Sequence, residues 1–207
     1  MTTNEISTHD KLRREAAALF ARRGYGGTSM AEIADRVGIR KASLYNYYDS
    51  KADLMVELLE QSLEDWEKAC QVEVPEEASI EKRLAAYLSA AVRFGRRHPQ
   101  SLGIIRLAAG QMPRDLRQRV QMIIDRHDQE WRKALIAMFQ EAMDRGEVEE
   151  ADPDQLGLFW GVFVDGLLIN QIFGTTKAEA MLAQIQSLWQ MFWRGVGGRA
   201  PSTELQI

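Results

Sequence analysis

The sequence predicts an all-α protein of about nine helices, arranged as a small N-terminal three-helix domain and a larger helical C-terminal domain. Apolar residues recur at the three- and four-residue spacing of one helix face through almost the whole chain. Glycine and proline residues separate the periodic stretches, as they do where helices begin and end. Of the 207 residues, 45% are hydrophobic, which is enough for a substantial core.

The first predicted helix covers residues 8–23. Its apolar face consists of Leu12, Ala16, Leu19 and Phe20. A glycine-rich stretch starting at Gly24 ends the helix. Lys11, Arg13 and Arg14 lie on other faces, where they form either a solvated surface or contacts to phosphate groups.

Residues 28–51 then place two helices around a glycine corner. Ser29 and Glu32 have the spacing of a capping box, and the apolar period that follows stops at Gly38, which can adopt the left-handed backbone conformation. A second, short helix is predicted from Lys41 to Tyr48. Two helices joined by such a turn, the second carrying exposed donors, are the arrangement that places a recognition helix in the major groove of DNA.

The charge distribution agrees with this interpretation. The net charge of the chain is −4, but residues 1–51 contain nine Lys and Arg against six Asp and Glu. The remainder is therefore acidic. Because affinity for DNA depends on local cations that displace counterions, the basic end coincides with the segment expected to bind DNA.

The run FARRGYGGTSMAEIADRVGIRKASLYNYYDSKADL, Phe20 to Leu54, resembles the N-terminal DNA-binding domain of the TetR/AcrR family of transcriptional repressors. Both glycine corners, the Thr-Ser helix start, the LYxYY segment and the following SKxxL are present. The resemblance covers about the first quarter of the chain. It implies an all-helical homodimer that binds operator DNA through its N-terminal helices and a small-molecule effector through its C-terminal domain.

The resemblance also implies which residues contact DNA. At the start of the second helix they are Thr28 and Ser29, and on the recognition segment they are Arg40, Lys41, Ala42, Ser43, Tyr45 and Asn46. Tyr47 matches a phosphate-binding aromatic residue, and Lys51 matches the basic residue that starts the fourth helix. Arg40 departs from the family, which often has a small hydroxyl residue there; it removes a helix cap and adds a side chain suited to guanine or phosphate. Tyr45 could instead be a half-buried core residue.

A long helix is expected to run to about Val72, capped by Asp49 or by Ser50, with Asp53 completing a capping box from Ser50. In the family it joins the DNA-binding domain to the effector-binding domain. Another helix follows from Ser79 to His98. The basic cluster at its end, Arg93, Arg96, Arg97 and His98, either complements the helix dipole or binds the acidic part of a ligand, such as a carboxylate or a coenzyme A phosphate.

The longest periodic stretch runs from Pro113 to Gly146. Aromatic residues and methionines of the middle and later helices could form either an ordinary core or the wall of a cavity for an apolar molecule. The candidate ligand-binding residues are Trp66, Phe94, Met122, Trp131, Phe159 and Phe163.

Two apolar helices close the chain, one beginning at Asp154 and one covering residues 177–194. The first is hydrophobic on nearly all sides, which requires burial on more than one side. A two-fold interface with a second copy would provide the second side. The candidate interface residues are Phe159, Val162, Leu167, Asn170, Trp189, Phe192 and Trp193.

No catalytic or metal-binding motif is present, and no enzyme activity, cofactor or metal site is expected. The single cysteine, Cys70, favours a reducing compartment. No segment has the pattern of a signal peptide or a membrane span, so a cytoplasmic location and no membrane partner are expected. The expected division is a DNA-binding domain at 1–51, a ligand-binding and dimerisation domain at 52–195 and a flexible tail at 196–207.

Two functions fit these observations. The first is a ligand-responsive DNA-binding regulator, expected to be a homodimeric repressor, although activation is also open. The second is a helical small-molecule carrier whose N-terminal helices pack without binding DNA. Arg40, Lys41 and the Thr28-Ser29 helix start favour the first, because a packing module has no need of them.

Overall fold

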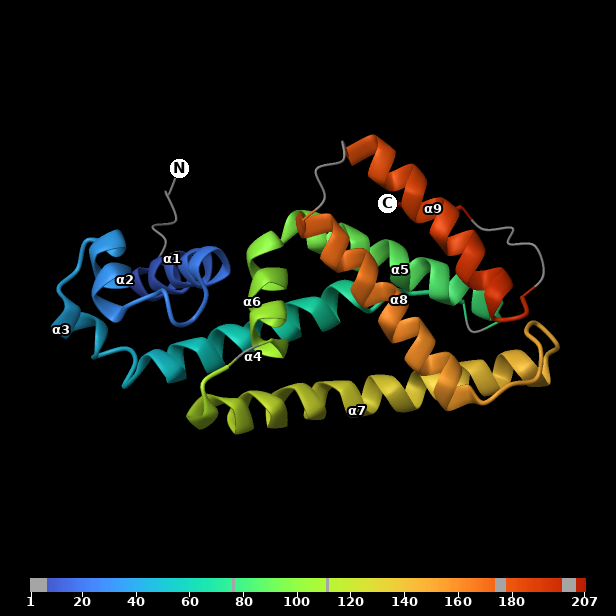
Figure 1. The fold of residues 1–207 in the computed structure, drawn as a ribbon, viewed down its shortest axis with the longest axis horizontal. Coiled ribbons are helices and arrows are strands. Elements are labelled where there is room, and N and C mark those ends of the chain that lie inside the picture. The colour runs from blue at the N-terminus through green and yellow to red at the C-terminus, as the bar shows by residue number, and fades with distance from the viewer. Residues whose placement is uncertain (1–6, 76, 111, 174–177, 199–203) are drawn as a thin grey trace. The chain divides into compact units, whose positions relative to one another are not determined.

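A computed structural model describes residues 7–75, 77–110, 112–173, 178–198 and 204–207, without the side chains of 170–173 and 178–181. Within these ranges the chain forms helices and no strands, which confirms the predicted all-α fold (Figure 1). The helices are α1 Thr8–Arg23, α2 Met30–Val37, α3 Lys41–Leu44, α4 Lys51–Cys70, α5 Ile80–Arg97, α6 Pro99–Ala109, α7 Arg114–Asp144, α8 Pro153–Phe173 and α9 Ala178–Gly195.

The chain folds into two compact units. One unit contains Met1–Asp65 and His98–Asp125, and the other contains Trp66–Arg97 and Arg126–Ile207. The chain therefore passes from one unit to the other three times: within α4, between α5 and α6, and within α7. The expected functional division at residue 51 stays a prediction, and positions 199–203 of the expected tail lie outside the described residues.

In the first unit, α1 packs against both α2 and α6. Fully buried side chains of this core include Leu12, Phe20, Ile33 and Leu54. At Gly103 on α6, an added Cβ would lie only 2.9 Å from Cβ of Ala21 on α1. Glycine is therefore required for the close approach of these two helices.

In the second unit, α5 and α9 both pack against α8. The core is aromatic: Trp160 and Trp189 are fully buried, and their rings meet edge to face with centroids 6.3 Å apart. Phe192 lies against Trp160 at 5.2 Å and against Phe163 at 4.7 Å. Ring packing therefore contributes much of the stability of this unit.

Three local expectations differ from the structure. The α-helix predicted to reach Tyr48 ends at Leu44, because a run of tyrosines and an asparagine favours the helix poorly. The helix expected to reach Val72 ends at Cys70. At Ser29 the hydroxyl oxygen accepts from the backbone N–H of Glu32 at 3.2 Å, but the Glu32 carboxylate pairs with Arg23, so only half of the predicted capping box forms.

Candidate nucleic-acid interface

The corner between α2 and α3 is formed by Gly38 in the left-handed conformation, with φ 76° and ψ 30°. The N–H of Gly38 donates to the carbonyl of Asp35 at 3.2 Å, and that of Ile39 donates to the carbonyl of Ala34 at 3.0 Å. These bonds satisfy two of the carbonyls at the end of α2 and turn the chain sharply into α3. The predicted glycine corner is confirmed.

The segment after the corner has one buried and one exposed side. Leu44 and Tyr48 point into the core of the first unit. The residues left exposed are Arg40, Lys41, Ala42, Tyr45, Asn46 and Tyr47, with Ser43 half-buried. Tyr45 and Tyr47 keep 43% and 46% of their surface exposed, so neither is a core residue within this chain. All seven were predicted to face DNA.

Hydrogen bonds tighten the backbone after α3. Asn46 donates to the carbonyl of Ser43 at 3.3 Å, and Tyr47 donates to that of Leu44 at 3.0 Å, which are the three-residue spacings of a tighter turn. Arg40 precedes α3 without a side-chain cap, as its residue type predicts. Its guanidinium therefore makes no capping hydrogen bond at the start of α3.

Thr28 and Ser29 have different roles in the structure. Ser29 is exposed and caps α2. Thr28 is buried, and its hydroxyl donates to the carbonyl of Gly24 at 3.0 Å. The Thr28 side chain thus stabilises the glycine-rich loop from within, while Ser29 lies at the surface where a phosphate could approach the helix start.

Lys51 joins the loop before α2 to the start of α4. Its ammonium donates to the carbonyls of Tyr25 and Thr28 at 2.8 and 2.9 Å and lies 4.2 Å from the centre of the Tyr25 ring. Burial lowers the pKa of Lys51. The side chain was predicted to contact DNA as the basic residue that starts this helix; here it holds the loop that presents Ser29.

A hydrogen-bonded group beneath Tyr47 was missed by the sequence reasoning. The hydroxyl of Tyr48 donates to Oε1 of Glu57 at 3.0 Å and lies 2.9 Å from Nε2 of His9. Burial and the Glu57 carboxylate raise the pKa of Tyr48 well above its usual value. The centre of the His9 ring lies 5.6 Å from that of Tyr48 and 6.0 Å from that of Tyr47. No local spacing signals this group, because its members are distant in sequence.

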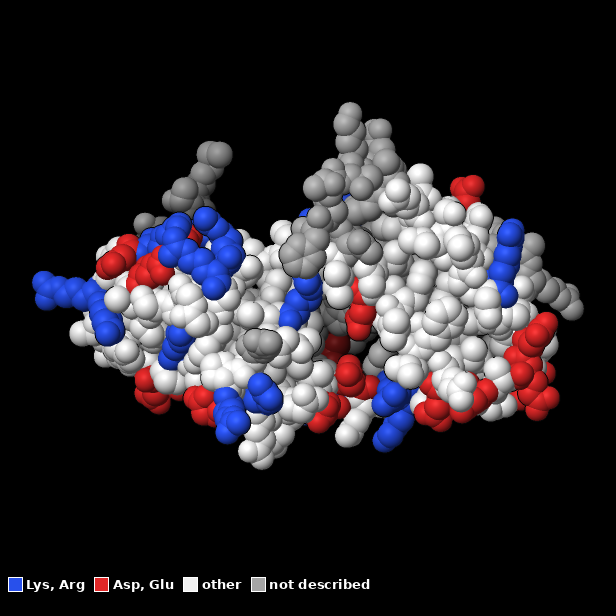
Figure 2. Space-filling view, in the orientation of Figure 1, with Lys and Arg blue, Asp and Glu red and all other residues white. Residues whose placement is uncertain are grey.

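Some basic side chains of this unit bind partners within the chain, whereas others are exposed. Arg13 donates to Gln61 at 2.7 Å and pairs with Glu57 at 3.5 Å, so it has a structural partner rather than a free surface role. Lys41 is exposed and lies 5.9 Å from the ring centre of Tyr45. On the face shown in Figure 2, Lys and Arg side chains gather over α1 to α3 with acidic side chains among them.

The start of α4 is also well capped. The Ser50 oxygen accepts from the backbone N–H of Asp53 at 3.1 Å, which confirms the predicted cap. The Asp53 carboxylate accepts from the Ser50 hydroxyl at 2.6 Å and from Arg119 at 2.9 Å. These two interactions lower the pKa of Asp53.

The six candidate ligand-binding residues do not form one group. In the second unit, Trp66 lies edge-on to Phe94 at 5.3 Å and to Tyr87 at 6.4 Å, and Trp131 stacks on Tyr87 at 4.3 Å. Met122 belongs to the other unit and is 65% exposed. It lies off the stripe formed by Val120 and Ile123, so the spacing alone could have excluded it.

Tyr87 is the residue that sequence reasoning missed at the centre of this group. It contacts Trp66, Trp131 and Trp160, the last at 6.0 Å. Burial raises the pKa of Tyr87, and burial also raises the pKa of the nearby Cys70 thiol to about 12. The Tyr87 hydroxyl and the Cys70 thiol are therefore neutral polar groups within an aromatic cluster.

The candidate interface residues divide into two sets. Phe159 and Val162 are exposed, whereas Leu167, Trp189, Phe192 and Trp193 are buried within the second unit, and the side chain of Asn170 is not among those described. Other apolar side chains of α8 and α9 are exposed instead: Leu158, Ile169, Leu188 and Met191. A helix that is apolar on every side does not show in its sequence which side its own core will cover.

Neither a metal site nor a membrane span was found in the parts of the chain that the structure describes. No cluster of three or more His, Cys, Asp or Glu side chains in these ranges could hold a metal ion. None of the helices in these ranges has the length and hydropathy needed to cross a bilayer.

Comparison with known proteins places the exposed segment within a known domain. Residues 12–58 match the family model described as bacterial regulatory proteins, tetR family. The HTH-type transcriptional repressor KstR2 of Mycolicibacterium smegmatis is 32% identical over 96 residues, which is 45% of this chain and 46% of that protein. The biofilm operon negative transcriptional regulator IcaR of Staphylococcus aureus is 47% identical over 45 residues, 22% of this chain and 24% of IcaR. The matches thus span less than half the length of these relatives.

Solved structures extend the likeness to nearly the whole chain. The ketosteroid transcriptional regulator KstR2 of Mycobacterium tuberculosis has a TM-score of 0.72 at 24% identity, over 96% of this chain and 98% of that one. AibR, solved in complex with isovaleryl coenzyme A and operator DNA, has a TM-score of 0.70 at 20% identity, over 93% of this chain and 100% of that one. At these identities the likeness shows a shared fold. The N-terminal segment thus matches the tetR family model, and the chain shares the fold of these solved regulators.

Proposed function

We propose that this protein is a DNA-binding transcriptional regulator that acts in the cytoplasm as a homodimeric repressor and leaves its operator when a small, largely apolar effector binds. The observation that carries the proposal is the exposed side of α3 and the turn after it. There, six exposed residues follow a glycine corner while Leu44 and Tyr48 anchor the segment in the core.

The chemistry of that exposed side suits DNA. Arg40 and Lys41 supply positive charge, Asn46 can bond a base edge and Tyr47 can donate to a phosphate. The segment is fixed from beneath by Tyr48 and at its flank by the Lys51 contacts. A recognition surface needs this rigidity, because displacement of a side chain weakens its hydrogen bonds to bases.

Dimerisation is supported by the surface of α8 and α9. Val162 is 62% exposed and Met191 is 66% exposed, and four further large apolar side chains on these helices face solvent. A concentration of exposed apolar residues on two adjacent helices is typical of an interaction surface. A second copy would cover it by a two-fold arrangement, and a two-fold dimer matches the symmetry of palindromic operators.

The effector is expected to contact the aromatic cluster around Tyr87. AibR was solved with isovaleryl coenzyme A, whose acyl group is apolar. Here Trp66, Tyr87 and Trp131 offer flat apolar surfaces, and the indole N–H of buried Trp160 has no acceptor among the described residues. An unpaired buried donor is costly, so an effector with an acceptor oxygen would bind favourably there.

The path of α4 suggests how binding is transmitted. The helix starts at Lys51, which holds the loop before α2, and its later residue Trp66 contacts Tyr87 and Phe94 in the second unit. An effector that moves Trp66 acts on the same helix that positions the DNA-binding segment. Repression would then end because the effector prefers a state with a different recognition-helix geometry.

The test is selection of DNA from a random pool, followed by gel retardation of the selected fragment at increasing salt. We expect affinity to fall steeply with salt, and Lys41→Ala and Tyr47→Ala each to weaken binding by about tenfold or more. Lys82→Ala, an exposed lysine of α5 with the same charge change, is the matched control and should bind as the wild type does.

Two results would contradict the proposal. If both variants bind the selected fragment as the wild type does, the exposed segment is not the DNA-binding surface. If no sequence is selected from the pool, the chain is better explained as a helical small-molecule carrier.

A further inference from the structure

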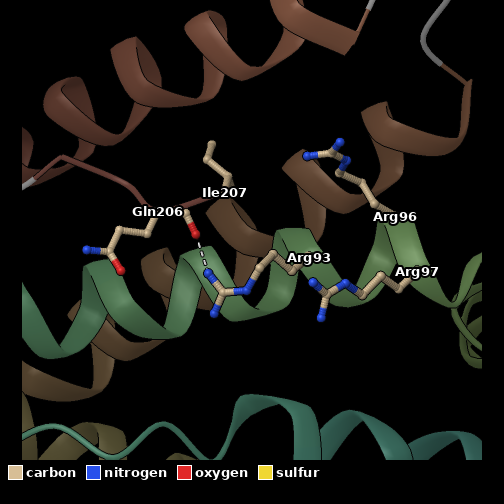
Figure 3. A pocket seen from close by; sticks show the side chains of 5 residues that line it. All are labelled: Arg93, Arg96, Arg97, Gln206 and Ile207. Atoms are coloured by element: carbon tan, nitrogen blue, oxygen red, sulfur yellow. Dashed lines mark hydrogen bonds between the residues drawn. The ribbon is translucent and has the colours of Figure 1, made fainter.

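A basic pocket lies at the end of α5 in the second unit. It has a volume of about 400 Å³ and is lined by Arg93, Arg96, Arg97, Gln206 and Ile207 (Figure 3). This volume falls within the range of about 300–1,000 Å³ that is usual for small-molecule sites. Arg96 and Arg97 lie three and four residues beyond Arg93 on the same helix, so each is a neighbour of Arg93 on the helix surface.

These arginines differ from Arg83, which lies earlier on α5. Arg83 pairs with the Glu141 carboxylate at 3.0 Å. Within the described segments, no carboxylate pairs with Arg96 or Arg97, and both are exposed. Complementing the dipole of α5 would require positive charge near its end, but it would not require a concave wall opposite that charge.

The rest of the pocket lining comes from Gln206 and Ile207, which belong to the segment 204–207. The backbone N–H of Gln206 donates to the hydroxyl oxygen of Ser89 on α5 at 3.1 Å, and that of Leu205 donates to Oε1 of Gln186 on α9 at 2.8 Å. These bonds hold the segment in place, and the carbonyl oxygen of Gln206 accepts from the Arg93 guanidinium. Figure 3 shows this oxygen directed at Arg93. One guanidinium already binds an oxygen acceptor at the pocket wall.

We propose that Arg93, Arg96 and Arg97 form a binding site for a small molecule that carries a diphosphate. Guanidinium groups bind phosphate oxygens in bidentate pairs, and two adjacent phosphates offer enough oxygens for three arginines. The site would hold the charged part of an effector. Only its role in releasing the protein from DNA rests on the proposed function, since binding of a diphosphate does not require DNA binding.

The first experiment measures binding of inorganic pyrophosphate to the full chain by calorimetry at low salt. The key variant is Arg96→Ser combined with Arg97→Ser, because both side chains are exposed and Arg93 can keep its contact with Gln206. We expect the affinity of the variant to fall by about tenfold or more. Arg132→Ser on α7 is the matched control, an exposed arginine of the same unit outside the pocket, and should bind as the wild type does.

A second series identifies the source of the diphosphate. Free coenzyme A and octanoyl coenzyme A are compared with pyrophosphate on the same proteins. Tighter binding of the octanoyl ester supports the site and points to a diphosphate attached to an apolar acyl group. Equal binding of all three supports the site and points to the diphosphate alone.

The outcomes separate this site from the proposed regulatory role. Equal pyrophosphate affinity in the wild type and the double variant would overturn the site, and so would absence of pyrophosphate binding to the wild type. Loss of DNA binding by the double variant without ligand would also overturn it, because it would place these arginines on DNA. Pyrophosphate binding by a protein that selects no DNA would leave the site standing and remove only the proposed function.

Discussion

The loop before α2 and the helix pair α8 and α9 are held by different kinds of interaction. In the loop, the Lys51 ammonium and the Thr28 hydroxyl donate to backbone carbonyls. Between the two helices, rings such as those of Trp160 and Phe192 pack together, and apolar side chains remain at the surface. Hydrogen bonds fix direction, whereas ring packing depends mainly on buried area.

This difference suits the two tasks proposed for the chain. A surface that reads DNA needs donors in fixed positions, and the Lys51 contacts provide a rigid support for Ser29. A domain that responds to an effector needs packing that can rearrange without leaving many polar groups unpaired. Substitutions in the two regions should therefore change the free energy of unfolding by different amounts, and their effects should spread over different distances.

The largest effect is expected from Trp160→Ala. The side chain is almost fully buried among Tyr87, Phe163 and Phe192, so its removal leaves a cavity. We expect a loss of about 3–5 kcal/mol in the free energy of unfolding, measured by urea titration. Met122→Ala, at an exposed position, should change it by less than about 0.5 kcal/mol. A loss under about 1 kcal/mol at Trp160 would show that ring packing does not dominate this unit.

A smaller and more local effect is expected from Lys51→Met, which keeps most of the apolar stem and removes the ammonium. The carbonyls of Tyr25 and Thr28 lose their partner, which should cost about 1–3 kcal/mol. Hydrogen exchange should show faster exchange of amides in residues 25–33 and little change in α8. The control is Lys41→Met, whose exposed side chain should be replaceable without loss of stability. If the amides of residues 25–33 are protected from exchange equally in both variants, Lys51 does not hold this loop.

A still smaller effect is expected at the cap of α2. Ser29→Ala removes the acceptor for the Glu32 N–H and should lower the free energy of unfolding by about 1 kcal/mol. Ser29→Asp keeps an acceptor, so its stability should stay near that of the wild type while its negative charge weakens DNA binding. DNA binding by Ser29→Asp at wild-type affinity would place the phosphate contact elsewhere.

The smallest effect is expected from Asp53→Asn, and it depends on pH. Hydrogen bonds from Ser50 and Arg119 lower the pKa of Asp53 below 3.8, so its contribution is complete above that value and is lost as the pH falls through the folded-state pKa. Because this pair is exposed, the variant should lose only about 0–1 kcal/mol at neutral pH. The difference in unfolding free energy should shrink toward zero in acid. A difference that persists in strong acid would show that charge is not its cause.

Local features of the first unit could be predicted from the sequence because their causes lie within a few residues. The cap at Ser29, the turn at Gly38 and the cap at Ser50 each involve groups no more than about five residues apart. Within the recognition segment, Arg40, Lys41, Asn46 and Tyr47 are exposed as expected, whereas Tyr45, for which a half-buried core position was left open, is also exposed. Met122, a candidate ligand-binding residue, is exposed, and its place off the apolar stripe of α7 already indicated that exposure.

Long-range contacts could not be predicted in the same way. The Tyr48 hydroxyl meets His9 and Glu57, residues that are 39 and 9 positions away. Glu32 pairs with Arg23 instead of completing its own capping box. Glu32 had a local role available in the capping box, and the packing of helices supplied a different partner.

The helices, their main boundaries and the glycine corner could be predicted from the sequence, because periodicity, caps and turns act over short distances. Helix packing sets which side of α8 and α9 is buried, where Lys51 and Thr28 direct their donors, and that the arginines at the end of α5 line a pocket with Gln206 and Ile207. These features depend on which helices meet, and contacts between distant segments leave no periodic signal in the residues that make them.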